Sequence, residues 1–153
     1  MKIATLQYTY PPLKNWGDFV KKNEMIVKNL SKNGIPLILF PEYAHSELFS
    51  IIKGKEFDGF QEMLLHYPEF FQTLSRKYKL YTCSKTYFVK EGNSYRTRAF
   101  FFGPTGYCGF QDKIQLTPSE HEEQRFSSGS SLQIFMTAAL YNNSIASISR
   151  VVQ

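Results

Sequence analysis

The sequence predicts an α/β fold in which a mixed β-sheet carries helices on one face. Residues 2–40 have the pattern of strand, helix and strand, which is the repeating unit of layered α/β proteins. Residues 80–110 then hold three β segments separated by turns, which would add antiparallel strands to the sheet. With 153 residues, 42% of them hydrophobic, the chain is long enough for one domain with a buried core.

The first strand is predicted at residues 2–7, and Tyr10-Pro11-Pro12 ends it. A helix should begin after Asn15, a possible N-cap with Asp18 three residues later. Its apolar residues recur at helical spacing, and they are Phe19, Val20, Ile26, Val27 and Leu30. Asn33-Gly34 is a typical helix end.

Residues 35–40 contain no polar side chain and lie between Gly34 and Pro41. A short apolar run that follows a helix is typical of a strand buried on both faces. Glu42 comes directly after this strand, at its carboxyl end. Ligands of layered α/β proteins collect at this end of the strands, so Glu42 is a candidate site residue.

A second helical zone is predicted at residues 57–78, and Pro68 should split or kink it because proline is not tolerated inside a helix. Residues 80–89 and 95–102 flank the turn sequence Glu91-Gly92-Asn93-Ser94, which predicts a hairpin. Pro104-Thr105-Gly106 marks a further turn into a strand at residues 107–110. These β segments predict a mixed sheet.

Composition excludes several classes of protein. The longest apolar runs, residues 37–40 and 99–102, fall far short of the roughly 18 residues that span a bilayer. The N-terminus does not have the pattern of a secretory signal, so we expect a cytoplasmic protein without membrane contact. A net charge of +5 would suit a nucleic-acid binder, but the lysines flank one amphipathic segment without an accompanying motif. We therefore expect no nucleic-acid partner.

Three charged residues are candidates for chemistry. The apolar run before Glu42 disfavours its charged form and could poise it as a proton acceptor. Lys113 follows a predicted strand, and a fixed ammonium in a closed site can stabilise an oxyanion. Glu120 lies seven residues later and could orient Lys113 or contact the substrate. Each residue taken alone also fits an ordinary surface or helix-start charge.

The combination of these residues resembles the nitrilase superfamily of carbon-nitrogen hydrolases. Its hallmarks are a strand ending in Pro-Glu, a later Asp-Lys followed by L-x-P-x-E, and then a cysteine on a subsequent strand. The matching residues are Pro41-Glu42, Asp112-Lys113, Leu116, Pro118 and Glu120. The resemblance covers residues 1–135, which we take as the N-terminal part of the hydrolase domain.

The resemblance implies an α-β-β-α sandwich, of which this chain would supply the N-terminal portion. It also implies hydrolysis of a non-peptide amide, carbamoyl or nitrile bond by a cysteine thiolate, without a metal or an organic cofactor. Glu42 would be the general base, Lys113 the oxyanion partner and Glu120 the supporting carboxylate. Members of the family commonly form homo-oligomers and act on small molecules.

The nucleophile is where the resemblance ends. Its position falls near Ser147, but neither flank matches, and a serine is much harder to deprotonate than a thiol. Cys83 and Cys108 lie upstream of Lys113 and are expected to be buried free thiols, so the nucleophile stays unknown. We expect residues 136–153 to be a divergent or out-of-frame tail and the chain to be a truncated member without turnover. The alternative is a noncatalytic relic or interaction module that pairs with a full-length relative.

Overall fold

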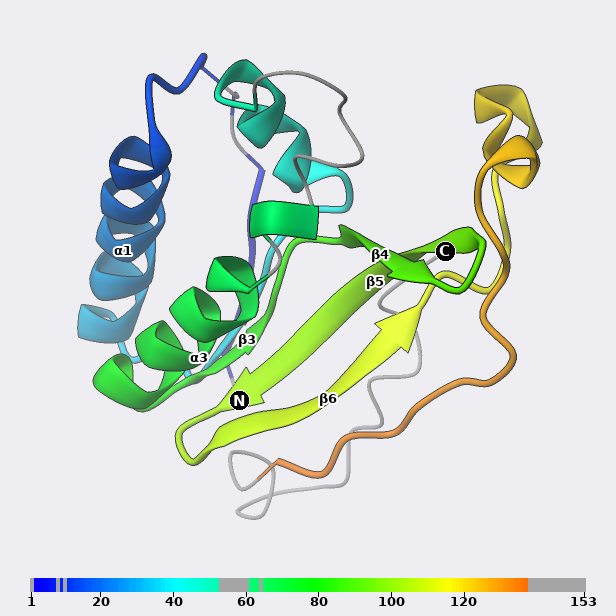
Figure 1. Cartoon of the computed structure of the whole chain (residues 1–153). Coiled ribbons are helices and arrows are strands. Elements are labelled where there is room, and N and C mark those ends of the chain that lie inside the picture. The colour runs from blue at the N-terminus through cyan, green and yellow to red at the C-terminus, as the bar shows by residue number, and fades with distance from the viewer. Residues whose placement is uncertain (1, 8, 10, 53–60, 64, 138–153) are drawn as a thin grey trace.

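The computed structural model describes residues 2–7, 9, 11–52, 61–63 and 65–137, and it shows one mixed sheet with helices packed beside it (Figure 1). The two long helices are α1 (Trp16–Lys32) and α3 (His66–Tyr78). The strands are β1 (Ile3–Thr5), β2 (Leu37–Leu39), β3 (Tyr81–Cys83), β4 (Tyr87–Glu91), β5 (Ser94–Gly103) and β6 (Gly106–Asp112). Short 3-10 helices lie at η1 (Ala44–Ser50), η2 (Pro118–Glu120) and η3 (Glu122–Gln124).

Helix α1 begins and ends where the sequence predicts. The Asn15 side chain accepts a hydrogen bond from the Asp18 backbone N–H at 3.0 Å, which satisfies one of the free amides of the first turn. Asn33 is the C-cap, and Gly34 follows with φ of 69°, a conformation that costs glycine little. The predicted N-cap and helix end are both confirmed.

The sheet combines parallel and antiparallel pairs. Strand β2 lies between β1 and β3 and pairs in parallel with both, with Ile38 opposite Ala4 and Thr82. Strand β5 is antiparallel to β3, β4 and β6, so the β4–β5 hairpin and the β5–β6 hairpin extend the parallel part.

The two faces of the sheet bury different side chains. On one face, Phe19 and Val27 of α1 and Phe71 of α3 pack in a single core with Ile38 and Phe102 from the sheet. On the other face Leu37, Cys83, Ala99 and Phe101 form a smaller cluster with Phe135. The large core contains residues of both helices and the small cluster contains none. The predicted α/β class, with helices on one face of a mixed sheet, is confirmed for the described residues.

One prediction about local structure was wrong. Residues 80–89 are not one strand, because β3 ends at Cys83 and β4 begins at Tyr87. The Ser84 hydroxyl accepts a hydrogen bond from Phe100 N–H at 3.0 Å, and this side-chain contact interrupts the regular ladder. The predicted split of the second helical zone near Pro68 is confirmed: residues 61–63 are helical, residue 65 is a turn, and α3 begins at His66 with the proline in its first turn, where a missing N–H costs nothing.

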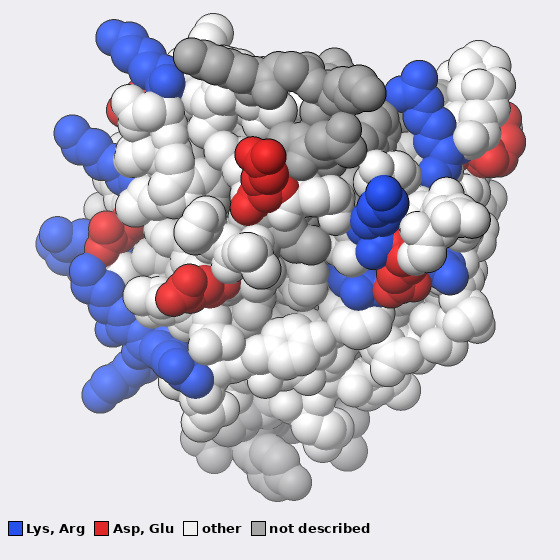
Figure 2. All heavy atoms as spheres, viewed as in Figure 1, with Lys and Arg blue, Asp and Glu red and all other residues white. Residues whose placement is uncertain are grey.

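The surface charge follows α1. Exposed lysines of this helix, Lys21, Lys28 and Lys32, lie on its solvent side, and Figure 2 shows basic side chains along the edge of the molecule that α1 forms. No helix among the described residues is long and apolar enough to cross a membrane. Part of the predicted second helical zone, residues 57–60, and residues 138–153 of the predicted tail lie outside the described residues.

Candidate active site

Glu42 and Lys113 lie in direct contact. Glu42 follows β2, Lys113 follows β6, and the Glu42 Oε1 to Lys113 Nζ distance is 3.0 Å. Only 3% of the Lys113 side chain is exposed, against 31% for Glu42. The pair thus has a buried ammonium and a carboxylate that solvent can reach. Two residues that are far apart in the sequence form one site at the ends of their strands.

The backbone of Lys113 is fixed on both sides. Its N–H donates to Thr97 O in β5 at 2.8 Å, and its carbonyl accepts from Gly129 N–H at 2.8 Å. Gly129 approaches so closely that a Cβ there would lie 2.9 Å from the carbonyl oxygen of Asp112. Any larger residue would push this segment away from Lys113. The strand end and the glycine together direct the lysine side chain toward Glu42.

Two further groups hold the ammonium. Lys113 Nζ donates to Thr117 Oγ1 at 2.8 Å and to Glu122 Oε1 at 3.1 Å, and the Glu122 side chain is 3% exposed. Burial raises the pKa of the Glu122 carboxyl, and the nearby charge of Glu42 raises it too, while the Thr117 N–H at 2.6 Å from its Oε2 opposes both. One ammonium therefore lies between two carboxylates.

Glu42 Oε1 keeps a free acceptor site. This oxygen is buried and within ion-pair distance of Lys113, but it receives no aligned hydrogen bond from a described residue. The ammonium has three N–H donors, and Thr117 and Glu122 take two of them. A carboxylate oxygen with an open lone pair beside a fixed positive charge can accept a proton from a bound nucleophile.

The predicted supporting carboxylate, Glu120, lies in η2, and its side chain is outside the described part of the chain. Its role stays a prediction. The structure adds Glu122, at the start of η3, which sequence reasoning did not single out. Residues 119–124 read Ser-Glu-His-Glu-Glu-Gln. In short successive 3-10 turns, the spacing of these glutamates does not indicate which of them faces Lys113. Nine residues separate Glu122 from Lys113, and only the turn geometry brings them together.

Tyr43 completes one wall of the site. It has φ of 55°, an unusual left-handed conformation for a bulky residue, and its ring centroid lies 5.3 Å from Lys113 Nζ. Farther along the same loop, His45 is fully buried and Phe49 is 39% exposed. Burial lowers the pKa of His45 to about 3, and a hydrogen bond to the Thr86 backbone opposes this shift. His45 is a neutral core residue that packs 4.4 Å from Phe88, measured between ring centroids.

The thiols lie elsewhere. Cys83 is in the small cluster on the far face of the sheet, and burial raises its pKa to about 12. Cys108 is in β6, where its Sγ donates to Gly106 O at 3.6 Å, and burial of the sulfur raises its pKa as well. High thiol pKa values disfavour the nucleophilic thiolate. Both cysteines are free thiols as predicted, but the prediction that both are buried is wrong for Cys108, which is exposed on β6.

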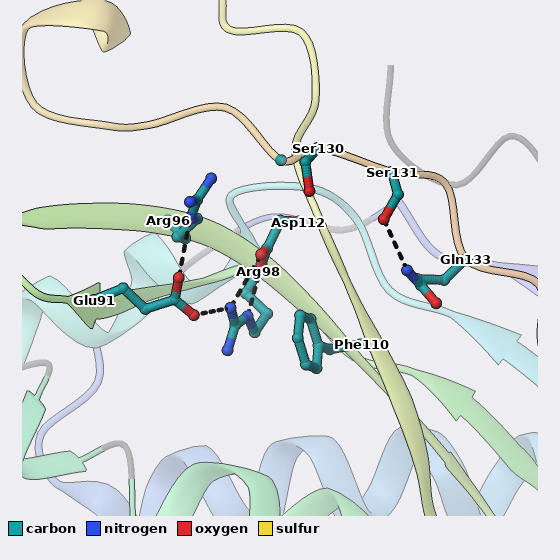
Figure 3. A pocket seen from close by; sticks show the side chains of 9 residues that line it. Glu91, Arg96, Arg98, Phe110, Asp112, Ser130, Ser131 and Gln133 are labelled. Atoms are coloured by element: carbon teal, nitrogen blue, oxygen red, sulfur yellow. Dashed lines mark hydrogen bonds and ion pairs between the residues drawn. The ribbon is translucent and has the colours of Figure 1, made fainter.

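A second charged cluster lies beside the site on β4, β5 and β6 (Figure 3). Arg98 contacts Asp112 through two parallel hydrogen bonds, Nε to Oδ1 at 2.6 Å and Nη2 to Oδ2 at 3.0 Å. Arg98 also contacts Glu91 and covers the Phe110 ring at 3.7 Å. These side chains line a hollow of about 230 Å³. Because Asp112 precedes Lys113, the Arg98 fork anchors the end of β6 next to the ammonium.

The described residues contain no group of three or more His, Cys, Asp or Glu side chains that could hold a metal ion.

The fold of the chain is similar to that of solved carbon-nitrogen hydrolases. A carbon-nitrogen hydrolase from Helicobacter pylori superposes with a TM-score of 0.72 at 18% identity, over 89% of this chain and 47% of that one. An amidase from Nesterenkonia sp. AN1 gives 0.67 at 17% identity, over 89% and 53%. Nit3 of Saccharomyces cerevisiae, a nitrilase-superfamily member, gives 0.61 at 14% identity, over 84% and 49%. The chain has the nitrilase-superfamily fold.

Sequence comparison finds a similarity to a probable hydrolase. The chain is 23% identical over 141 residues to a probable hydrolase of Bacillus subtilis, YhcX, and it covers 28% of that protein. No family model matches the chain. The chain spans about half the length of the solved nitrilase-fold structures named above.

Proposed function

We propose that this chain carries the general base and the oxyanion-stabilising residue of a carbon-nitrogen hydrolase of the amidase or nitrilase type. The observation behind the proposal is the contact between Glu42 Oε1 and the buried Lys113 Nζ, with Glu122 behind the ammonium. The substrate would be a small molecule with a non-peptide amide, carbamoyl or nitrile group. In the Nesterenkonia amidase structure, acrylamide has added to the active-site cysteine, which supports thiol chemistry for this fold.

The geometry gives each residue a separate task. Glu42 would take the proton of the attacking thiol, and the thiolate would then form a bond to the carbonyl carbon. Lys113 would stabilise the negative oxygen of the tetrahedral intermediate, an effect that is strong because its side chain is only 3% exposed. Glu42 would return the proton to the leaving nitrogen as the C–N bond breaks, and then activate water to cleave the thioester. Glu122 would keep the ammonium in place.

A second candidate function follows from the position of the thiols. Cys83 lies in the small cluster on the face of the sheet that the helices do not cover, and Cys108 lies in β6. Among the described residues, the Lys113 ammonium contacts oxygen-bearing side chains and the Tyr43 ring, and neither thiol. A chain of this kind could retain the Glu42–Lys113 pair as a noncatalytic relic or as an interaction module that pairs with a full-length relative.

An ammonia-release assay on a panel of amides, carbamoyl amino acids and nitriles separates the two functions. Turnover that iodoacetamide blocks and that Glu42→Gln reduces by at least about 100-fold would establish the hydrolase activity and would overturn the expectation that this chain alone is inactive. Lys21→Met, which changes an exposed lysine of α1, is the matched control and should keep full activity. Absence of turnover across the panel, with the folded chain in excess, would favour the noncatalytic module.

A further inference from the structure

The segment between β3 and β4, Ser84-Lys85-Thr86, contacts the loop that carries Glu42. The Tyr43 backbone N–H donates to Thr86 Oγ1 at 2.9 Å, and Thr86 is 4% exposed. Tyr43 is the residue after Glu42, and it adopts the left-handed conformation that turns the chain out of β2. A side-chain hydroxyl from the segment between β3 and β4 therefore satisfies the amide of this left-handed residue.

The same segment holds the loop at a second place. Lys85 forms an ion pair with Glu47 of η1, and both side chains are fully buried. The Lys85 ammonium also lies 5.7 Å from the centroid of the Phe40 ring, which precedes the Pro41-Glu42 turn. The Lys85 backbone carbonyl accepts a hydrogen bond from Tyr67 O–H at 2.8 Å, and this bond connects the segment to α3. The segment between β3 and β4 is thus held by contacts with η1 and with α3.

The turn matters because a left-handed tyrosine is strained. A non-glycine residue in this conformation costs on the order of 1 kcal/mol and persists only where neighbouring contacts hold it. Here the strained turn sets the direction of the Glu42 side chain and brings the Tyr43 ring near the Lys113 ammonium. Losing the hydroxyl would let the turn relax and would move both groups.

We propose that Thr86 is a positioning residue, whose hydroxyl holds the Tyr43 turn and thereby keeps Glu42 against Lys113. Thr86 does not touch the site itself, and it acts through the Tyr43 amide. The catalytic meaning of this role rests on the proposed function, whereas the positioning is a property of the folded chain. If residues 84–86 continued the strand, Thr86 would not reach the Tyr43 amide. The interruption between β3 and β4 therefore makes this hydrogen bond possible.

The test compares Thr86→Val, which keeps the shape and removes the hydroxyl, with Thr86→Ser, which retains it. In the full chain labelled with ¹⁵N and ¹³C, NMR follows the Lys113 side-chain signal, assigned with Lys113→Arg. Glu42→Gln is introduced into the wild-type, Thr86→Val and Thr86→Ser chains. We expect the change that Glu42→Gln causes in this signal to shrink about twofold or more in Thr86→Val and to persist in Thr86→Ser. An equal change in all three chains would overturn the proposal.

Amide hydrogen exchange separates positioning from general loosening. In Thr86→Val, the Tyr43 amide should exchange about 10-fold faster or more, while the Lys113 amide, bonded to Thr97 O, keeps its rate. A parallel acceleration of both amides would show a structural role alone and would contradict the proposal. The ammonia-release assay tests the proposed function separately, because the NMR coupling between Glu42 and Lys113 needs no turnover.

Discussion

Replacing Lys113 with methionine should destabilise the chain in a pH-dependent way. The substitution keeps a long apolar side chain and removes the ammonium that lies between Glu42 and Glu122. Breaking a buried ion pair from one side costs about 3–5 kcal/mol. We expect about 3 kcal/mol near pH 7, the lower end, because 31% of the Glu42 side chain is exposed and water screens its charge.

The pH dependence comes from Glu122. Its pKa is raised in the folded state, so the folded chain binds this proton more tightly than the unfolded chain, and ionisation of Glu122 opposes folding as pH rises. Removing the ammonium raises this pKa further. The cost of Lys113→Met should therefore be smaller at pH 5 than at pH 7, because the raised pKa leaves a larger fraction of Glu122 protonated at the lower pH.

Urea unfolding at the two pH values measures the effect. Adding Glu122→Gln to Lys113→Met should recover about 1–2 kcal/mol near pH 7, because it removes the stranded buried charge. Lys21→Met is the matched control, with an expected change within about 0.5 kcal/mol at both pH values. An equal loss at both pH values, or a further loss on adding Glu122→Gln, would refute this reasoning.

Three more predictions concern the rest of the fold. In the native chain, iodoacetamide should modify Cys108 well before Cys83, because burial raises the pKa of Cys83 to about 12. Peptide mass spectrometry measures the two rates, and equal rates would contradict this prediction. The pKa of His45 is lowered to about 3, so the folded state binds this proton less tightly than the unfolded state and stability should fall as pH drops from about 6.5 toward 3. Urea titrations of His45→Phe should lose that part of the slope, and an unchanged slope would argue against a buried neutral imidazole. Arg98→Lys keeps the charge but loses the double hydrogen bond to Asp112, so it should lower the free energy of unfolding in urea by about 1–2 kcal/mol. Arg96→Lys should cost less, and the reverse order would contradict the role of the Arg98–Asp112 pair.

Local signals in the sequence were enough to predict much of the fold. The Asn15 cap, the Asn33-Gly34 helix end and the apolar run before Pro41 each depend on neighbouring residues only, and the structure has them where they were predicted. The break at residues 84–86 was missed because it depends on a side-chain contact between Ser84 and Phe100 on another strand. Such a contact leaves no periodic trace in the sequence.

The candidate site likewise has one part that the sequence predicts and one part that depends on tertiary contacts. The sequence by itself determined that Glu42 and Lys113 follow strands, because strand ends can be read from apolar runs and turn residues. Only the tertiary structure decided that the two meet at 3.0 Å, that Glu122 stands behind the ammonium and that Thr86 holds the turn beside Glu42. These contacts join residues on separate elements, and they arise because packing two helices on one face of the sheet fixes how its strand ends and loops lie together.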